Sequence, residues 1–280
     1  MKLLILSDAH GGRWQAKPLI ELVEPDLIVI PGDLPGSIDF PVLVLSYIGG
    51  RRSNYVRNSY SRFHERLTFR QIRTAKRLLD EIVDYNIPIL LIHGNTETRE
   101  TRTWMKLYCD RYRNLHWISD DSVIIDDIQF VGHGWVGVPP NYDRIRTPGE
   151  IDEKDSEKIL KKQIKLLNFD VDQSVLVSHA PPYGTSLDYL PHKRIHAGSK
   201  PIRKALNSRK LSVSISGHLH ESLGVYIGKK WWGINAGAVI EDTACTVDLK
   251  TKEVIWYKNV VNKFGLSPFI YSKRTKVKYD

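Results

Sequence analysis

The chain has 280 residues, of which 41% are hydrophobic and 26% are charged, and its formal net charge is +9. These proportions are those of a folded globular protein with one packed core, and they exclude a disordered or low-complexity chain. The two cysteines stand far apart, so neither a disulfide framework nor a CxxC metal site is predicted. The positive charge favours anionic partners such as nucleotides, phosphorylated metabolites or nucleic acid.

Long apolar segments are absent from the sequence. The apolar start is interrupted by Asp8 and His10 before it reaches the length of a secretory signal. The longest apolar stretch elsewhere, residues 40–48, is far shorter than the ~20 residues that a membrane-spanning helix needs. We therefore expect a cytoplasmic protein without a membrane partner, and the oligomeric state is left open.

The hydrophobic pattern predicts strands and helices that alternate along the chain. Five short runs rich in Leu, Ile and Val indicate buried strands, at residues 2–7, 26–31, 87–93, 174–179 and 211–216. Periodic segments between them indicate helices, at residues 17–23, 70–85, 152–167 and 199–208. Two other segments, 122–131 and 245–257, are each divided by a polar turn and predict β-hairpins. This alternation is typical of an α/β layer fold with a mixed sheet system.

A segment rich in arginine lies between the second and third predicted strands. From residue 51 to residue 77 the only acidic residue is Glu65, and several aromatic residues are interleaved with the basic ones. We interpret residues 36–70 as a basic aromatic insertion within a single domain of residues 1–280. Three roles are open: a solvated helix, a surface that binds phosphates and bases of a substrate, or a protein-docking surface. Residues 272–280 are expected to form a solvated basic tail.

A possible metal ligand follows each of the five predicted strands directly. In chain order these residues are Asp8 and His10, Asp33, Asn95, His179, and His218 with His220. In open α/β sheets, ligands bind outside the carboxyl ends of the strands, where several loops converge. We therefore expect these side chains to meet at one edge of the sheet system.

The spacing and chemistry of these residues fit a site for two metal ions. Two pairs, Asp8/His10 and His218/His220, are i,i+2 pairs whose side chains project to one side of an extended segment. A glycine, which permits tight turns, precedes three of the ligands, at positions 32, 94 and 217. Imidazole, carboxylate and amide ligands suit Mn, Fe, Zn or Co better than Ca or Mg. Two ions ~3.5–4 Å apart would activate water and clamp an in-line displacement at phosphorus.

The ordered motifs resemble those of the calcineurin-like metallophosphoesterases. They are Asp8-x-His10, Gly32-Asp33, Gly94-Asn95, His179 and Gly217-His218-Leu219-His220, and together they extend from residue 8 to residue 220. The resemblance implies an α/β fold, a four-layer αββα sandwich with two mixed β-sheets flanked by helices. It also implies hydrolysis of a phosphate ester with two divalent ions, of which Mn is our first expectation among Mn, Fe, Zn and Ni.

The resemblance further assigns a role to each ligand. One ion would be held by Asp8, His10, Asp33 and His220. The second would be held by Asp33, Asn95, His179 and His218. Asp33 would bridge the two ions, and a hydroxide between them would attack phosphorus. Asp33 and Asn95 are on this basis catalytic residues as well as ligands.

One position departs from the pattern of the family. Relatives often have a histidine after Gly-Asn, which is thought to stabilise the transition state or protonate the leaving group, but this chain has Thr96. The enzyme could act on esters with good leaving groups, another residue could supply the proton, or catalysis could be lost. We favour the first two explanations, with His133 as the leading substitute acid and His64 as a weaker one.

Three arginines are candidates for binding the substrate phosphate, because a guanidinium can pair with two phosphate oxygens. They are Arg13, Arg99 and Arg102, which lie shortly after ligands of the predicted site. The first functional hypothesis is a phosphodiesterase, somewhat favoured over a phosphatase, that acts on a phosphorylated small molecule or nucleotide. The alternatives are a nuclease that binds RNA or DNA through the basic insertion, and a non-catalytic scaffold that retains the fold.

Overall fold

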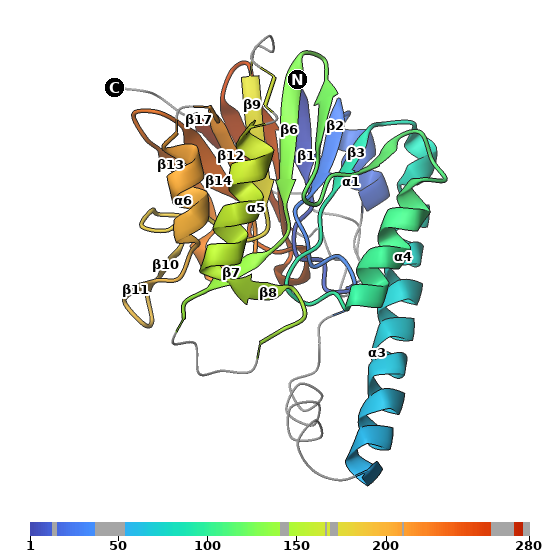
Figure 1. The fold of residues 1–280 in the computed structure, drawn as a ribbon. Helices are drawn as coiled ribbons and strands as arrows, with labels where there is room; N and C mark the ends of the chain where they lie inside the picture. Colours follow the sequence, from blue (N-terminus) through green and yellow to red (C-terminus); the bar gives the residue numbers. More distant parts are fainter. Residues whose placement is uncertain are drawn as a thin grey trace.

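The computed structural model describes residues 1–12, 16–36, 54–140, 146–165, 167–168, 173–208, 210–258 and 272–276. Within residues 54–63 and 272–276 it describes only the backbone. Two stacked β-sheets form the centre of the molecule, and helices cover their outer faces (Figure 1). Among the described residues, no helix has the length and apolar character needed to cross a membrane.

The first sheet has seven strands in the order β17-β16-β15-β1-β2-β3-β4. Strands β1, β2, β3 and β4 are parallel; β15 pairs antiparallel with β1, β16 with β15, and β17 with β16. Their bounds are β1 (Lys2–Ile5), β2 (Leu27–Ile30), β3 (Ile89–Leu91), β4 (Leu115–Trp117), β15 (Thr243–Asp248), β16 (Glu253–Lys258) and β17 (Ser272–Lys276). The expected solvated tail is therefore wrong for residues 272–276, because their backbone pairs with β16 as an edge strand.

The second sheet has six strands in the order β13-β14-β12-β9-β6-β5. The inner strands β14, β12, β9 and β6 are parallel, and β13 and β5 lie antiparallel at the edges. Their bounds are β5 (Ser122–Ile125), β6 (Ile128–His133), β9 (Gln173–Ser178), β12 (Val213–Ser216), β13 (Gly224–Ile227) and β14 (Trp232–Asn235). Two small ribbons lie apart from the sheets, β7 (Val136–Val138) with β8 (Glu150–Asp152), and β10 (Tyr189–Leu190) with β11 (Ile195–His196).

Alternation along the strands divides the apolar side chains between two faces, because successive residues of a strand point in opposite directions. Leu3 and Ile5 of β1 join the cluster between the sheets, where they meet Val175 and Ile215 of the second sheet. Leu4 of the same strand points outward to the helices. This is the four-layer αββα arrangement, and the predicted fold is confirmed.

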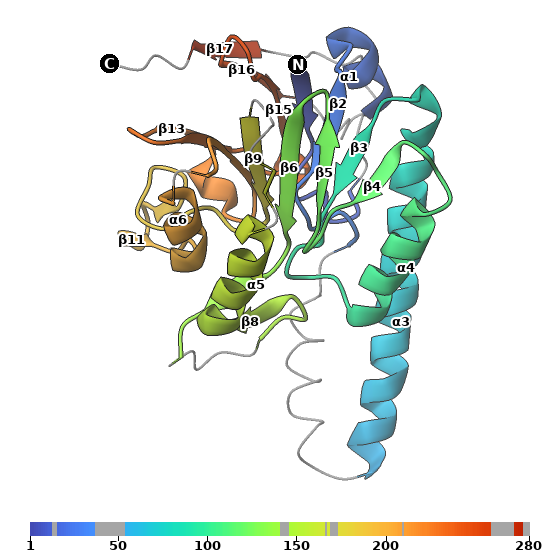
Figure 2. The ribbon, with the colours of Figure 1, turned by 45° about the horizontal axis from the view of Figure 1, so that its top comes forward.

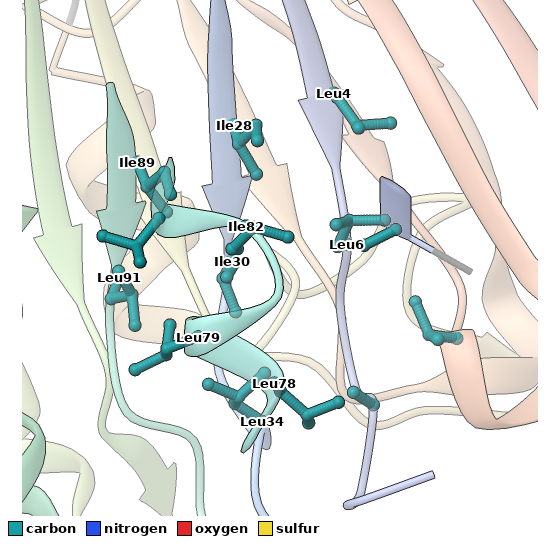
Figure 3. Packing of buried hydrophobic residues seen from close by; sticks show 14 of the residues in the cluster. Leu4, Leu6, Ile28, Ile30, Leu34, Leu78, Leu79, Ile82, Ile89 and Leu91 are labelled. Carbon is teal, nitrogen blue, oxygen red and sulfur yellow. The ribbon is translucent and has the colours of Figure 1, made fainter. Parts of the chain in front are cut away.

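Five helices cover the two outer faces in the described part of the chain. On the first sheet lie α1 (Ala16–Val23), α3 (Asn54–Asp80) and α4 (Arg99–Cys109), and on the second lie α5 (Glu153–Lys165) and α6 (Lys200–Leu206). Figure 3 shows how Leu78, Leu79 and Ile82, at the end of α3 and just after it, pack against Ile28 and Ile30 of β2. In Figures 1 and 2 the other end of α3 extends beyond the sheets.

The structure corrects the predicted extent of one helix and adds another. The helix expected at 70–85 begins already at Asn54 and ends at Asp80, and a 3₁₀ turn η1 (Val83–Tyr85) follows before Asn86 adopts a left-handed conformation with φ of 57°. Helix α4 was not predicted, because its mixed sequence hides the few buried positions. Its start is set by Thr98, whose hydroxyl accepts the N–H of Thr101 and so caps the helix.

Candidate metal centre

The seven predicted ligands come together at the carboxyl ends of five parallel strands. In the first sheet they follow β1, β2 and β3, and in the second they follow β9 and β12. Stacking of the two sheets brings both sets of loops to the same end of the molecule (Figure 1). A backbone hydrogen bond joins the loops after β1 and β2, because the N–H of Asp8 donates to the carbonyl of Gly32 at 3.2 Å.

Three ligands form a group that is partly open to solvent, and we call Asp8, His10 and His220 the open group. Asp8 Oδ1 lies 3.4 Å from His220 Nε2 and 3.8 Å from His10 Nε2. The three ligand atoms lie close enough to one another to hold one ion. Asp8 Oδ1 is buried and has no hydrogen-bond partner, which is costly for a carboxylate unless a cation neutralises it.

The remaining ligands, Asp33, Asn95, His179 and His218, make up the enclosed group. His179 Nε2 lies 3.4 Å from Asp33 Oδ2 and 3.0 Å from Asn95 Oδ1. The ring of His218 is 4.8 Å from that of His179, and the backbone N–H of His218 donates to Asp8 Oδ2 at 3.0 Å. Asp33 connects the two groups, because its Oδ2 is also 3.7 Å from His10 Nε2. This arrangement suits a carboxylate shared by two ions.

Two effects set the pKa values of the enclosed group: burial, and the attraction between its carboxylate and its imidazole groups. Burial alone would raise the pKa of Asp33, but His179, His10 and Thr96 hold it well below its usual value, so Asp33 is ionised at neutral pH. Burial lowers the pKa of His179, but Asp33, Asp8 and Glu97 raise it to about 10. His179 Nδ1 donates to the carbonyl of Pro31 at 2.9 Å, so a proton on Nε2 faces Asp33 and Asn95. A cation would occupy the same position.

The surroundings of His218 and His220 shift the pKa values of the two imidazoles in opposite directions. Burial and the neighbouring His179 lower the pKa of His218 to about 4, so its imidazole is neutral and has a free lone pair. Burial also lowers the pKa of His220, but Asp8 and Glu241 raise it to about 9. Glu241 Oε1 lies 3.0 Å from His220 Nδ1 and orients the ring so that Nε2 faces Asp8.

Four of the ligands adopt backbone conformations that are rare outside glycine. Asp8, His10, Asp33 and His218 have φ values of 52°, 45°, 50° and 67°. Such conformations cost roughly 1–3 kcal/mol each and persist where the surrounding structure enforces them.

The glycines before the ligands are required for space, as the sequence predicted. A Cβ at Gly32, which has φ of 103°, would lie 2.6 Å from His179 Nδ1. A Cβ at Gly94 would overlap the carboxylate of Asp33. At Gly217 it would overlap the side chains of Ser7 and Asp8. Any larger residue at these positions would therefore enter the cluster of ligands.

Glu97 holds together the two loops of the enclosed group, a role that the sequence did not reveal. The side chain is completely buried, and its two oxygens accept the N–H groups of Leu34 at 3.2 Å and Gly94 at 2.9 Å. These residues are direct neighbours of Asp33 and Asn95. Burial and the charge of Asp33 raise the pKa of Glu97 well above its usual value.

Thr96 supports the bridging carboxylate. Its N–H and its hydroxyl both donate to Asp33 Oδ1, at 3.0 and 2.8 Å, so Oδ2 is the oxygen left to face the histidines. Gln71 of α3 donates in turn to the carbonyl of Thr96 at 2.9 Å and accepts the N–H of Thr98 at 3.0 Å. The long helix is thus attached to the metal centre through a buried glutamine.

Asn95 is oriented by the segment that leads into β8. Asn95 Nδ2 donates to the hydroxyl of Thr147 at 3.0 Å, which leaves Oδ1 facing His179. Gly149 N–H donates to the Asn95 carbonyl at 2.9 Å. Arg102 Nη1 donates to the carbonyl of Pro148 at 3.0 Å and fixes the same segment.

The three arginines predicted to bind the substrate phosphate differ in their surroundings. Arg102 donates to the carbonyls of Glu97 and Pro148 and stacks 4.7 Å from the ring of Trp135, so its guanidinium is engaged by groups of the protein itself. Arg99 is exposed at the first position of α4. Arg13 lies outside the described residues.

Both predicted substitute acids make contacts with other side chains of the protein. His133 is completely buried, its Nε2 lies 2.9 Å from Ser156 Oγ of α5, and burial lowers its pKa to about 3. It is therefore neutral at pH 7 and cannot act as an acid. His64 Nε2 lies 3.0 Å from Glu100 Oε2 and connects α3 to α4.

Comparison with known proteins agrees with this geometry. A family model described as calcineurin-like phosphoesterase matches residues 1–222. The chain belongs to this family. One curated relative, the uncharacterized protein MJ1162 of Methanocaldococcus jannaschii, is 34% identical over 148 residues, which are 51% of this chain and 61% of that protein. The match thus spans less than two thirds of the relative.

Solved structures show the same calcineurin-like fold. One matches with a TM-score of 0.72 at 17% identity, covering 92% of this chain and 98% of the other. The protein TT1561 of Thermus thermophilus has a TM-score of 0.60 at 11% identity, covering 92% of this chain and 98% of its own. A dimetal phosphatase from Danio rerio has a TM-score of 0.53 at 13% identity, covering 91% and 95%.

Proposed function

We propose that this member of the calcineurin-like family hydrolyses phosphodiesters with two divalent ions, and that Mn serves in both positions. The observation that supports this best is the convergence of the open and enclosed groups on Asp33, whose Oδ2 lies within 3.7 Å of His10 and 3.4 Å of His179. A shared carboxylate between two groups of nitrogen and oxygen ligands is suited to a pair of transition-metal ions.

Each residue has a defined task in this proposal. Asp8, His10, Asp33 and His220 would hold one ion, and Asp33, Asn95, His179 and His218 the other. The two ions, when bound, lower the pKa of water and neutralise the charge that develops on phosphate. Thr96 and Glu97 keep the two loops in register, and Glu241 and Pro31 fix the ring orientations of His220 and His179.

The preference for diesters with good leaving groups is supported by the contacts of Thr96. Its hydroxyl is engaged by Asp33, and an aliphatic hydroxyl is far too weak an acid to protonate a leaving alkoxide. His133 is buried against α5 and stays neutral. Without a side-chain acid at either position, the reaction depends on the stability of the leaving group itself.

Activity with simple esters tests this proposal. With Mn, the purified chain should hydrolyse bis-p-nitrophenyl phosphate faster than p-nitrophenyl phosphate or an alkyl monoester. Asp33→Asn should lower kcat/KM by roughly 10³-fold or more, because the two-ion clamp is worth several kcal/mol and 1.36 kcal/mol is a factor of ten. A wild-type chain that binds two ions but hydrolyses none of these esters would contradict the proposal and favour the scaffold alternative.

Nuclease activity is a second candidate, favoured by one specific observation. Helix α3, which carries the basic segment, is joined through Gln71 to Thr96 and hence to Asp33. A substrate bound along this helix would lie next to the metal centre. Cleavage of an oligonucleotide by the wild type but not by Asp33→Asn would support this function. Hydrolysis of small diesters alone would reject it.

A cytoplasmic location stays a prediction from the sequence.

A further inference from the structure

One face of α3 carries a row of arginines that ends at the metal centre. The residues are Arg66, Arg70, Arg73 and Arg77, at intervals of four, three and four positions. On a helix such intervals place side chains on one face, about 5–6 Å apart. All four are exposed, whereas Gln71, Ala75 and Leu78 form the buried face of the same helix. We call these four residues the arginine row.

The inner end of the arginine row contacts the loop that carries a ligand. Arg77 Nη2 donates to the carbonyls of Gly11 and Gly12, at 3.1 and 3.2 Å, and these residues directly follow His10. From Arg77 to Arg66 the helix rises about 16 Å at 1.5 Å per residue. The arginine row therefore leads from the open group toward the end of α3 that extends beyond the sheets in Figure 2.

The charge of this face is not balanced along the helix. Residues 66–77 contain five basic residues and no Asp or Glu; acidic residues flank this stretch as Glu65, directly before Arg66, and as Asp80 and Glu81, of which Glu81 lies 3.8 Å from Arg77. Helix α5 offers a contrast. Its exposed Lys154, Lys158 and Lys162 have a similar spacing but are interleaved with acidic residues, and Lys158 lies 2.8 Å from Asp155. Of these two described helices, α3 has the larger excess of positive charge on its exposed face and is the better candidate for binding a polyanion.

An exposed aromatic residue accompanies the arginine row. Phe69 lies three residues after Arg66 and four before Arg73, and it is 65% exposed. A large apolar ring in water beside guanidinium groups is suited to stack on an unpaired base while the arginines contact the phosphates. A duplex would keep its bases stacked internally and would not use Phe69 in this way.

From these observations we infer that the arginine row and Phe69 bind single-stranded nucleic acid and direct its backbone toward the metal centre. The inference rests on the proposed phosphodiester hydrolysis, since the bound polymer is a chain of the esters that the centre would cleave. Each arginine replaces counterions of the phosphate backbone, and the aromatic ring contributes stacking that does not depend on sequence.

Binding is tested separately from cleavage. A fluorescein-labelled oligothymidylate of twenty nucleotides is titrated with the full chain in EDTA at several NaCl concentrations, and anisotropy reports the Kd. The triple variant Arg66→Gln, Arg70→Gln, Arg73→Gln should reduce the slope of log K against log salt by about 2, at ~0.7 per phosphate contact. The matched control is Lys154→Gln, Lys158→Gln, Lys162→Gln, which removes the same charge and should bind as the wild type does.

Phe69→Ala gives a second test of oligonucleotide binding, and it leaves the net charge of the protein unchanged. It should weaken binding by roughly 5- to 100-fold, the range of base stacking, without a change in the salt slope. Equal affinities for the arginine variant and its lysine control would overturn the inference. So would tighter binding of a duplex of the same length, or no binding by the wild type at low salt.

The hydrolysis of bis-p-nitrophenyl phosphate separates this inference from the proposed function. The arginine variant should keep the wild-type kcat/KM on this small ester and lose it on the oligonucleotide. If the wild type binds the oligonucleotide through the arginine row but hydrolyses no ester, the binding inference stands and the proposed function fails. If small esters are hydrolysed but the arginine variant cleaves the oligonucleotide normally, the inference fails alone.

Discussion

The open and enclosed groups of the metal centre are supported in different ways. In the open group the side chains of His10 and His220 are 13% and 21% exposed, and the support of His220 is Glu241, itself 56% exposed. In the enclosed group the side chains of His179 and Asp33 are 0% and 3% exposed. Their supports are the carbonyl of Pro31 and the donors of Thr96, all inside the protein.

This difference shows where the geometry of the site is fixed. Hydrogen bonds are stronger and harder to replace where water is excluded, so the enclosed ligands are held close to one position. Exposed charge pairs are worth little and adapt easily. We therefore expect the ion of the open group to dissociate first, and substitutions around the enclosed group to have the larger consequences.

The largest effect is expected for Glu97→Gln, which disturbs both loops of the enclosed group. The amide places an NH₂ group against either the N–H of Leu34 or that of Gly94, and an unsatisfied buried donor costs about 1–3 kcal/mol. Unfolding in urea should show this loss, and Mn titration calorimetry should show weaker binding of both ions. Glu24→Gln, at an exposed residue after α1, is the control. Equal stability and equal Mn affinity of the two variants would contradict the role of Glu97 in holding the two loops together.

Thr147→Val should affect one ion only. The variant keeps the shape of the side chain but removes the acceptor for Asn95 Nδ2, so the amide can rotate away from His179. Loss of such an outer partner typically weakens metal binding 10- to 100-fold. Calorimetry with Mn should resolve one weakened and one unchanged site, and Thr147→Ser should restore the first. Two equally weakened ions would show that Thr147 does not act through Asn95.

A pH-dependent effect is expected at His133, which lies behind the enclosed group and accepts the N–H of His179 at its carbonyl. Burial lowers its pKa to about 3, whereas the unfolded chain has the ordinary value of 6.5. The unfolded state therefore binds the proton more readily, and stability is complete above pH 6.5 and falls as the pH decreases. At pH 5.5 the loss from this one residue is about 1.4 kcal/mol.

His133→Gln removes this contribution, while its amide can still bond to Ser156. The difference in unfolding free energy between the wild type and this variant should change by about 1.4 kcal/mol from pH 7.5 to pH 5.5. Urea unfolding in EDTA measures it without interference from metal release, and other titrating groups cancel in the difference. A constant difference across this range would mean that His133 is not neutral in the folded protein.

The smallest effect is expected at the open group, for Glu241→Gln. The amide oxygen can still accept the proton of His220 Nδ1, so only the charge is lost. Because the carboxylate is exposed, binding of the open-group ion should weaken by at most about tenfold, and less at high salt. An effect larger than that of Thr147→Val would reverse the order of the two groups.

The sequence pattern identified the metal ligands clearly but not the residues that hold those ligands in place through hydrogen bonds. Asp8, His10 and Asp33 were predicted because each directly follows a run that is legible as a strand. Thr147 and Glu241 carry no such signal, since each meets its partner only in space, 52 and 21 positions away along the chain. The contacts of Arg102 were not predicted, because proximity to Asn95 in sequence does not show which carbonyls the guanidinium contacts.

By itself the sequence determined an α/β layer fold, the seven side chains that follow the strands and the glycines beside them. Periodicity and chain order carry this information, because a buried strand and the turn after it are local features. The four-layer αββα arrangement came from the resemblance of the ordered motifs to a known family. Only the tertiary structure decided how the ligands are held: which oxygen of Asp33 is occupied by Thr96, which way Asn95 points, and that α3 is attached through Gln71. These depend on contacts between loops that sequence separates and that the stacking of two sheets brings together.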